Sequence, residues 1–199
     1  SHKQPVASVY EHDVVQYDKV PGLFRQIVDD LGGLDLIVYA SGVMLPTGED
    51  EYNFQKDLQI VEVNLLGCMA WLDEAATMFQ RQASGAILAI SSVAGDRGRK
   101  KYPAYHTAKA GVTTFVESLR NRLTPLGVRV LTVKPGPVDT AMTAGMKMPF
   151  MIGAPQAAGT MLQWLQRPWL QTLYVAYRWW AIMTVIRLLP SFIMRRLNF

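Results

Sequence analysis

Three continuous apolar runs, each closed by small or turn-forming residues, constrain the fold of this chain more than any other feature. They are LDLIVYASG (residues 34–42), GAILAISS (85–92) and VRVLTVKPG (128–136). Apolar runs of this length are typical of strands that are buried on both faces of a parallel sheet. A more polar run, VASVYEHDV (6–14), predicts a further strand near the start of the chain.

Segments of helical length separate these runs. A helix is expected over residues 20–31, with Pro21 in its first turn, and a long helix over residues 54–82. A third helix carries Tyr105 and ends near Gly127. The alternation of strands and helices predicts an α/β fold with a doubly wound parallel sheet. Ligands of such sheets bind beyond the carboxyl ends of the strands, where this chain places Asp13, Gly42, Ser92 and Gly136.

The composition supports a single domain over residues 1–199. Hydrophobic residues make up 50% of the chain and charged residues 18%, which excludes a disordered protein. The one cysteine, Cys68, has no partner for an internal disulfide, so nothing indicates an oxidising compartment. The opening SHKQPVASVY has no apolar stretch of the signal-peptide kind. We therefore expect a cytoplasmic protein.

Tyr105 and Lys109 form the first candidate for a catalytic pair. Residues four apart share one face of a helix, with their Cβ atoms about 5–6 Å apart. The ordinary pKa of tyrosine, about 10, is too high for proton exchange at neutral pH, and a neighbouring cation lowers it. A tyrosine so placed is a general acid–base, and the hydroxyl of Ser92 can hold a substrate oxygen. Such a pair on its own is most often a chance arrangement.

Further motifs support the catalytic interpretation. The chain contains Ser92, the Y-x-x-x-K of Tyr105 and Lys109, Asn64 within VNLLG, and the PGPVDT turn (135–140). In this order and spacing they resemble the short-chain dehydrogenase/reductase (SDR) family over residues 6 to about 145. The resemblance implies a Rossmann-type fold and a catalytic tetrad of Asn64, Ser92, Tyr105 and Lys109.

The resemblance also implies the chemistry and the cofactor. Tyr105 would exchange a proton with a small-molecule carbonyl or secondary alcohol, while hydride moves to or from NAD or NADP. Lys109 would bind the nicotinamide ribose, and Asn64 would hold a water of the proton relay. No metal ion and no nucleic acid is implied. The cofactor contacts would be Asp13, Val14, Ala40, Ser41, Gly42, Tyr105, Lys109, Pro135, Gly136, Val138 and Thr140.

The chain departs from the family pattern in two places. Ala40 and Ser41, in YASG, stand where the family has asparagine and alanine. No G-x-G-x-x-G or T-G-x-x-x-G-x-G occurs, and the first two strand–helix units of the family are absent. We therefore expect a sequence that is incomplete at its N-terminus, with the strand at 6–14 separated from the strand at 34–42 by space for two more. The alternative is a catalytically inactive, truncated member that acts as a binding or scaffold protein.

The C-terminal segment, residues 168–199, is basic and apolar. After Asp139 the chain has six bases and no acid. The run RWWAIMTVIRLLPSFIMRRLNF (178–199) is broken by Pro190 and interrupted by arginines, so it does not predict a spanning helix. We expect it to pack on the domain, as buried core or as an oligomer interface. The second interpretation is a lid, or a peripheral contact with the inner face of a membrane.

Two further expectations concern the substrate and the assembly. SSVAGDRGRK, KPGPVDTAM and the basic tail resemble an SDR subgroup of reductases that act on a decaprenylphosphoryl 2-keto sugar, which implies a lipid-linked or phosphorylated sugar. The bases of GDRGRKK (95–101) would bind phosphate, or form a solvated loop. In the family, the helices beginning near Phe54 and Pro103 often pair across a two-fold axis, so we expect a homodimer or homotetramer.

Overall fold

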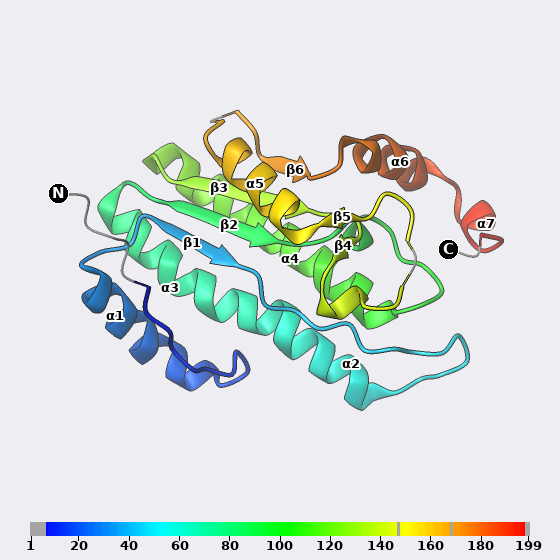
Figure 1. Ribbon diagram of the computed structural model, residues 1–199, viewed down its shortest axis with the longest axis horizontal. Helices are drawn as coiled ribbons and strands as arrows, with labels where there is room; N and C mark the ends of the chain where they lie inside the picture. Colours follow the sequence, from blue (N-terminus) through cyan, green and yellow to red (C-terminus); the bar gives the residue numbers. More distant parts are fainter. Residues whose placement is uncertain (1–6, 147, 168, 198–199) are drawn as a thin grey trace.

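The computed structural model describes residues 7–146, 148–167 and 169–197. Its centre is a four-stranded parallel sheet in the order β1-β2-β3-β6 (Figure 1). The strands are β1 (Leu36–Tyr39), β2 (Ala86–Ile90), β3 (Arg129–Lys134) and β6 (Thr172–Tyr174). A separate parallel pair is formed by β4 (Val138–Asp139) and β5 (Ile152–Gly153). The three apolar runs of the sequence are thus the first three strands of the sheet, and the doubly wound α/β prediction is confirmed.

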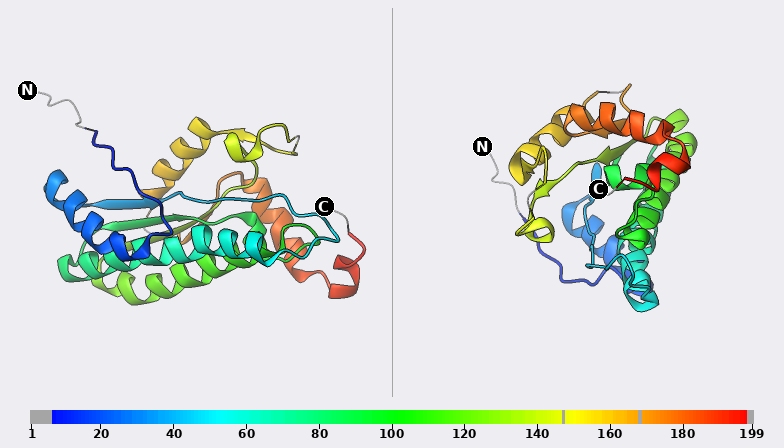
Figure 2. Two further views of the ribbon diagram at one scale, coloured as in Figure 1. Left: turned by 90° about the horizontal axis from the view of Figure 1, so that it is seen from below. Right: turned by 90° about the vertical axis from the view of Figure 1, so that its right-hand side faces the viewer.

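Helices cover both faces of the sheet (Figure 2). One face carries α1 (Val20–Leu31), α2 (Phe54–Val61), α3 (Gly67–Gln82) and α4 (Pro103–Leu123), and the other carries α5 (Ala154–Leu165). The C-terminal helices are α6 (Tyr177–Leu188) and α7 (Ser191–Met194). Short 3-10 turns span Tyr17–Lys19, Val93–Asp96, Thr124–Leu126 and Ala141–Thr143.

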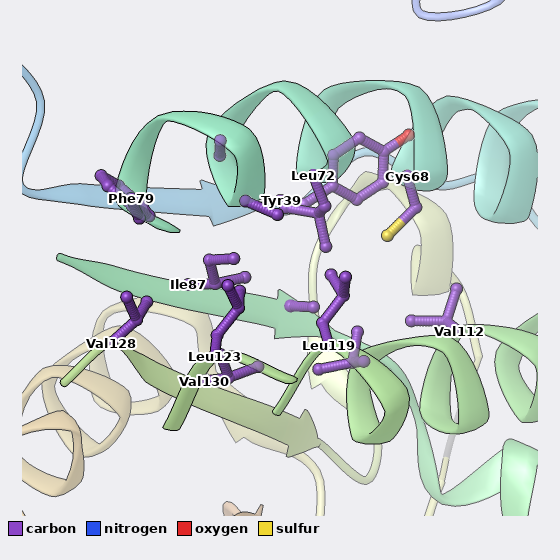
Figure 3. Packing of buried hydrophobic residues seen from close by; sticks show 14 of the residues in the cluster. Tyr39, Cys68, Leu72, Phe79, Ile87, Val112, Leu119, Leu123, Val128 and Val130 are labelled. Atoms are coloured by element: carbon purple, nitrogen blue, oxygen red, sulfur yellow. The ribbon is translucent and has the colours of Figure 1, made fainter. Parts of the chain in front are cut away.

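Alternate residues of the strands form two hydrophobic cores. Ile87 and Val130 pack against α3 and α4 together with Leu72 and Phe79, as Figure 3 shows. The opposite face of the same strands presents Leu88, which packs with residues of α5. Because successive strand residues point to opposite faces, an apolar run without alternation fills both cores at once.

The helix boundaries follow from local signals. The side chain of Asn53 accepts from the backbone N–H groups of Gln55 and Lys56 and so caps α2. Gly32 ends α1 in the left-handed conformation at φ 72°, which a residue without Cβ adopts at little cost. Pro103 opens α4, which ends at Leu123 and is followed by the 3-10 turn Thr124–Leu126 and then Gly127.

The long helix expected at 54–82 contains an irregularity. Between α2 and α3, residues Glu62–Leu66 form a π-helical turn, which inserts one residue and leaves carbonyl groups without helical partners. The Tyr39 hydroxyl donates to the carbonyl of Val63 at 2.8 Å. The turn carries Asn64, which is fully buried. Sequence periodicity does not show such a turn, because one extra residue barely changes the apolar spacing.

The strand expected at 6–14 does not form. Val6 lies outside the described residues, and residues 7–13 are extended without a ladder to any strand in the described part of the chain. The segment instead packs on α3, where the His12 ring meets Trp71 edge-on at 5.5 Å and Val14 lies against Gly67. A strand needs a hydrogen-bonding neighbour, and among the residues that the structure describes β1 pairs with β2 alone. The ladder to β1 that would contradict the expected separation is not present in the described residues, and the space for two more strands stays a prediction.

The C-terminal segment packs on the domain beyond β6. Arg97 donates to the carbonyls of Arg187 and Leu189 at 3.3 and 3.0 Å, which supplies partners for the carbonyl end of α6. Met183 of α6 is buried, and Pro190 separates α6 from α7. Residues 168, 198 and 199 lie outside the described part. None of the helices that the structure describes is both long and apolar enough to cross a bilayer.

Candidate active site

The turn after β2 fixes Ser92 against α4. The Ser91 hydroxyl donates to the carbonyl of Lys109 at 2.8 Å, and the His106 ring lies 2.6 Å from the carbonyl of Ala94. A Cβ at Gly95 would come within 2.7 Å of the Lys109 backbone, so glycine permits this close approach. These contacts place the end of the strand beside the first turns of the helix.

Tyr105 and Lys109 meet at this junction. The Lys109 ammonium donates to the carbonyl of Ile90 at 3.1 Å and lies 5.7 Å from the centre of the Tyr105 ring. Lys109 is 4% exposed, and within the described residues no carboxylate forms an ion pair with it. A buried lysine without an acidic partner is unusual in a structural role, because burial of its charge is costly.

Burial dominates the protonation of this pair. It lowers the pKa of Lys109 to about 8 and raises the pKa of Tyr105 above its ordinary value. A side-chain hydrogen bond with Ser92 and the positive charge of Arg99 oppose the rise for Tyr105. From the sequence, Lys109 was expected to be the group that lowers the pKa of Tyr105. In the structure, the opposing groups are Ser92 and Arg99.

Asn64 lies beside Gly42, close to Lys109. Its amide group donates to the carbonyls of Val43 and Ile60, both at 2.8 Å. Its buried amide oxygen has no partner in the described structure. A Cβ at Gly42 would lie 2.7 Å from that oxygen and 3.4 Å from the Lys109 ammonium. A buried acceptor beside a cation indicates a place for a polar ligand atom.

A cavity of about 1060 Å³ unites these groups. Of the residues predicted from the sequence, it is lined by Ala40, Gly42, Ser92, Tyr105, Lys109, Pro135, Gly136, Val138 and Thr140. Asn64 lies behind this wall. Ser41 does not line the cavity.

Asp13 and Val14 lie elsewhere. Asp13 opens a turn in which its carbonyl accepts from the N–H of Gln16 at 2.9 Å and its carboxylate accepts from the N–H of Val15 at 3.2 Å. Neither Asp13 nor Val14 lines the cavity, since the segment that carries them runs along α3. The sequence predicted Asp13 at the carboxyl end of a strand, and this prediction is wrong, because no strand forms there within the described residues.

Trp179 of α6 was not predicted from the sequence as a site residue. Its indole lies against Gly136, where a Cβ would come within 2.1 Å of the indole nitrogen. The buried indole N–H has no partner in the described structure, and the ring meets Phe150 edge-on at 6.2 Å. Gly136 in PGPVDT indicated that another group could pack closely against the backbone there, but the sequence did not indicate that this group is Trp179.

The sequence also did not predict a buried ion pair between Lys134 and Asp96. Lys134 contacts Asp96 at 2.5 Å, and the Tyr174 hydroxyl donates to the same carboxylate at 2.8 Å. The three residues come from the end of β3, the turn after Ser92 and the end of β6. They connect the turn that holds Ser92 to the C-terminal segment.

We expect Gly42→Ala to lower kcat at least about tenfold, because the new methyl group displaces the Asn64 amide oxygen and crowds the Lys109 ammonium. Gly48→Ala is the matched control, since its Cβ would meet nothing nearer than 3.6 Å. Steady-state kinetics and thermal melting of both variants separate loss of catalysis from loss of fold. Equal kcat in the two variants would argue against a catalytic position for Asn64.

Comparison with known proteins agrees with this geometry. Residues 2–148 match the profile of the short chain dehydrogenase family. An uncharacterized oxidoreductase of Staphylococcus epidermidis is 30% identical over 139 residues, which are 70% of this chain and 60% of the relative. A second one, of Staphylococcus aureus, is 30% identical over 141 residues, 71% of this chain and 61% of the relative. The chain thus spans about 60% of the length of these relatives.

Solved structures share the fold. A short-chain dehydrogenase of Burkholderia cenocepacia in complex with NADP aligns with a TM-score of 0.81 at 20% identity, over 95% of this chain and 77% of that one. An NAD+-bound xylitol dehydrogenase aligns with a TM-score of 0.74 at 19% identity, over 83% of this chain and 76% of that one. The parallel sheet, the convergence of Ser92, Tyr105 and Lys109 on one cavity, and the match over residues 2–148 lead to one conclusion: the chain belongs to the short-chain dehydrogenase family.

Proposed function

We propose that the protein carrying this chain is an NAD(P)-dependent oxidoreductase that interconverts a carbonyl group and a secondary alcohol. The observation that carries the proposal is the convergence of Ser92, Tyr105 and Lys109 on one cavity beside the turn at 135–140. The names of the relatives, which are oxidoreductases, support the same reaction class.

The residues around Lys109 fit the nicotinamide and its ribose. Two polar groups lie beside the turn at 135–140: the Asn64 amide oxygen, which has no partner in the described structure, and the Lys109 ammonium. Gly42 has no side chain to fill the space in front of them. Lys109 and Tyr105 would hold the ribose hydroxyls, and the turn at 135–140 would hold the carboxamide. When bound, the nicotinamide supplies or accepts the hydride.

The fit is weaker for the rest of the cofactor. The sequence has no glycine-rich phosphate loop, so the proposed contacts at that end are confined to Asp13, Val14, Ala40 and Ser41. Ala40 lines the cavity, and the other three do not. One structural neighbour holds NADP and another NAD+, so both cofactors are candidates.

Tyr105 is the proton donor or acceptor in this proposal. The Ser92 oxygen accepts from the N–H of Ala94 at 3.0 Å, which leaves its hydroxyl hydrogen for Tyr105 or a substrate oxygen. The Lys109 ammonium, 5.7 Å from the centre of the ring, would add to the effect of Ser92 and Arg99 in favouring the phenolate that forms when Tyr105 gives up its proton. The amide oxygen of Asn64 would accept a hydrogen bond from the water molecule that passes the proton onward.

The walls of the cavity favour a substrate with a large apolar part. Away from the catalytic groups the lining is almost entirely apolar: Met142, Met146, Met148, Phe150, Met161, Ile182 and Ile186. Arg99 and Lys101 are the basic residues of the 95–101 loop that line it, whereas Arg97 binds the end of α6. This combination supports the lipid-linked or phosphorylated sugar suggested by the subgroup resemblance.

The proposal is tested by titrating NADPH and NADH into the protein and following nucleotide fluorescence. We expect one of them to bind and to be oxidised when a carbonyl substrate with an apolar tail is added. Binding without turnover of any carbonyl compound would overturn the assignment as an oxidoreductase. Failure of both nucleotides to bind would favour the alternative, a catalytically inactive binding or scaffold protein.

We further propose a homodimer or homotetramer. The α2–α3 stretch exposes Phe54, Leu58 and Leu66, whereas Leu72 is fully buried in the core. Light scattering at micromolar concentration is expected to give a multiple of the 22.3 kDa chain. A monomeric mass would contradict the proposal.

A further inference from the structure

The outer face of α6 is apolar and exposed. Tyr177, Ala181, Thr184 and Leu188 follow the helical spacing of one ridge, and Leu188 is 80% exposed. Trp180 and Val185 flank the ridge and are also exposed. We call Tyr177, Trp180, Val185 and Leu188, with Phe192 of α7, the outer face. The opposite side of the same helix presents Trp179, Ile182 and Ile186 to the cavity.

Arginines border the outer face. Arg178 and Arg187 lie on opposite flanks of the ridge, because they are displaced from it by about a quarter turn in either direction. Arg195 and Arg196 follow α7, and all four arginines are exposed. An apolar ridge between arginines is the pattern of a helix that lies in a membrane interface, where apolar groups enter the acyl region and the arginines meet anionic headgroups.

The outer face continues to the rim of the cavity. The Arg178 guanidinium lies over the rings of Tyr177 and Phe150, at 5.9 and 5.2 Å from their centres. Phe150 and Met148 line the cavity and are themselves exposed. The apolar surface outside and the apolar wall inside are thus joined at one edge. In Figure 1, α6 and α7 lie at one end of the molecule, beyond β6 and away from β1.

Charge decides between two occupants of this surface. An isologous contact with a second copy would bring the four arginines against the same four arginines, and no acidic residue follows Asp139 to compensate them. A surface of anionic headgroups meets the same charge with attraction. A spanning helix is not an option, since no described helix is long and apolar enough.

We propose that the outer face of α6 binds the surface of a bilayer that carries anionic headgroups, with the rim of the cavity at the lipid. The evidence for membrane binding comes from the residues of α6 and α7 and does not depend on the proposed function. The entry of a lipid-linked substrate along this surface does rest on the proposed function. The arginines provide the attraction to the headgroups, and Trp180 and Leu188 provide the apolar insertion.

The proposal is tested by co-sedimentation with vesicles of phosphatidylcholine alone and of phosphatidylcholine mixed with phosphatidylglycerol. We expect binding to the mixed vesicles at least about tenfold tighter than to the neutral ones, and weaker binding in high salt. Trp180→Ser with Leu188→Ser is expected to reduce binding to the mixed vesicles about tenfold or more. Arg178→Gln with Arg187→Gln is expected to weaken the preference for the anionic lipid, with the remainder due to Arg195 and Arg196.

Leu31→Ser with Leu126→Ser is the matched control, because both leucines are exposed but lie far from α6 in sequence and outside the outer face. It is expected to bind vesicles as the unchanged protein does. Circular dichroism melting confirms that each variant folds. Equal binding to both kinds of vesicle, or equal binding by the Trp180/Leu188 variant and the control, would overturn the proposal. So would a halved mass of the Trp180/Leu188 variant in light scattering, which would assign the face to a second copy.

These measurements need no nucleotide and no substrate. Vesicle binding without turnover would therefore refute the proposed function and leave the surface intact. Turnover of a carbonyl compound without vesicle binding would refute the surface alone.

Discussion

Tyr105→Phe is expected to lower kcat by about a thousandfold or more while the dissociation constant of the nicotinamide nucleotide hardly changes. The substitution removes only the hydroxyl that exchanges a proton with the substrate oxygen. The ring stays in place, because it packs with Ile60, Ala104 and Ala108. Steady-state kinetics and fluorescence titration of the nucleotide measure the two quantities on the same protein.

Tyr10→Phe is the control for this experiment. Its hydroxyl donates to Asp30 at 2.7 Å on an exposed part of the N-terminal segment, remote in sequence from the cavity residues. This variant is expected to keep the kcat of the unchanged protein. If Tyr105→Phe and Tyr10→Phe turned over substrate at the same rate, Tyr105 would not be the acid–base, and the proposed mechanism would fail.

The part of the fold that could be predicted rests on short-range patterns. The apolar runs at 34–42, 85–92 and 128–136 became β1, β2 and β3 because a strand buried on both faces has little room for polar side chains. Helix α1 has the predicted boundaries, since Pro21 and Gly32 mark both ends. Ser92, Tyr105 and Lys109 line one cavity, as their spacing predicted, because the end of one strand and the first turns of one helix fix their positions.

What could not be predicted depends on residues distant in sequence. Residues 7–13 have a strand-like composition, but a strand also needs a neighbour, which only the fold reveals. The contact of Trp179 with Gly136 spans more than forty positions and leaves no periodic trace. The influence of Arg99 on Tyr105 was missed for the same reason, since a charge in a loop has no pattern that tells where it points.

The pKa values of Tyr105 and Lys109 could not be predicted from the sequence either. The sequence places a cation beside a phenol, and the expected result is a lower pKa for the phenol. Burial adds a larger effect of opposite sign on Tyr105 and lowers the pKa of Lys109 itself. Because burial is a property of the whole fold, neither effect was available from the spacing of the two residues.

Lys109→Met is expected to raise the free energy of unfolding at neutral pH by about 1–2 kcal/mol and to abolish turnover. Burial lowers the pKa of Lys109 from 10.5 to about 8, which corresponds to a cost of about 3 kcal/mol for keeping it charged. Methionine has a similar length and no charge. The variant loses the hydrogen bond to the carbonyl of Ile90, and this loss offsets part of the gain.

The sign of the pH dependence tests this explanation directly. Since the folded pKa lies below the unfolded one, the unfolded chain binds more protons between pH 8 and 10.5, and stability rises with pH in that interval. The advantage of the variant is therefore largest below pH 8 and shrinks as the pH rises toward 10.5. Urea unfolding across this range measures it, with Lys19→Met, at an exposed site, as the control that gains nothing. A constant difference between Lys109→Met and the unchanged protein at every pH would show that the ammonium is not held at a cost, and that its place beside Tyr105 is ordinary packing.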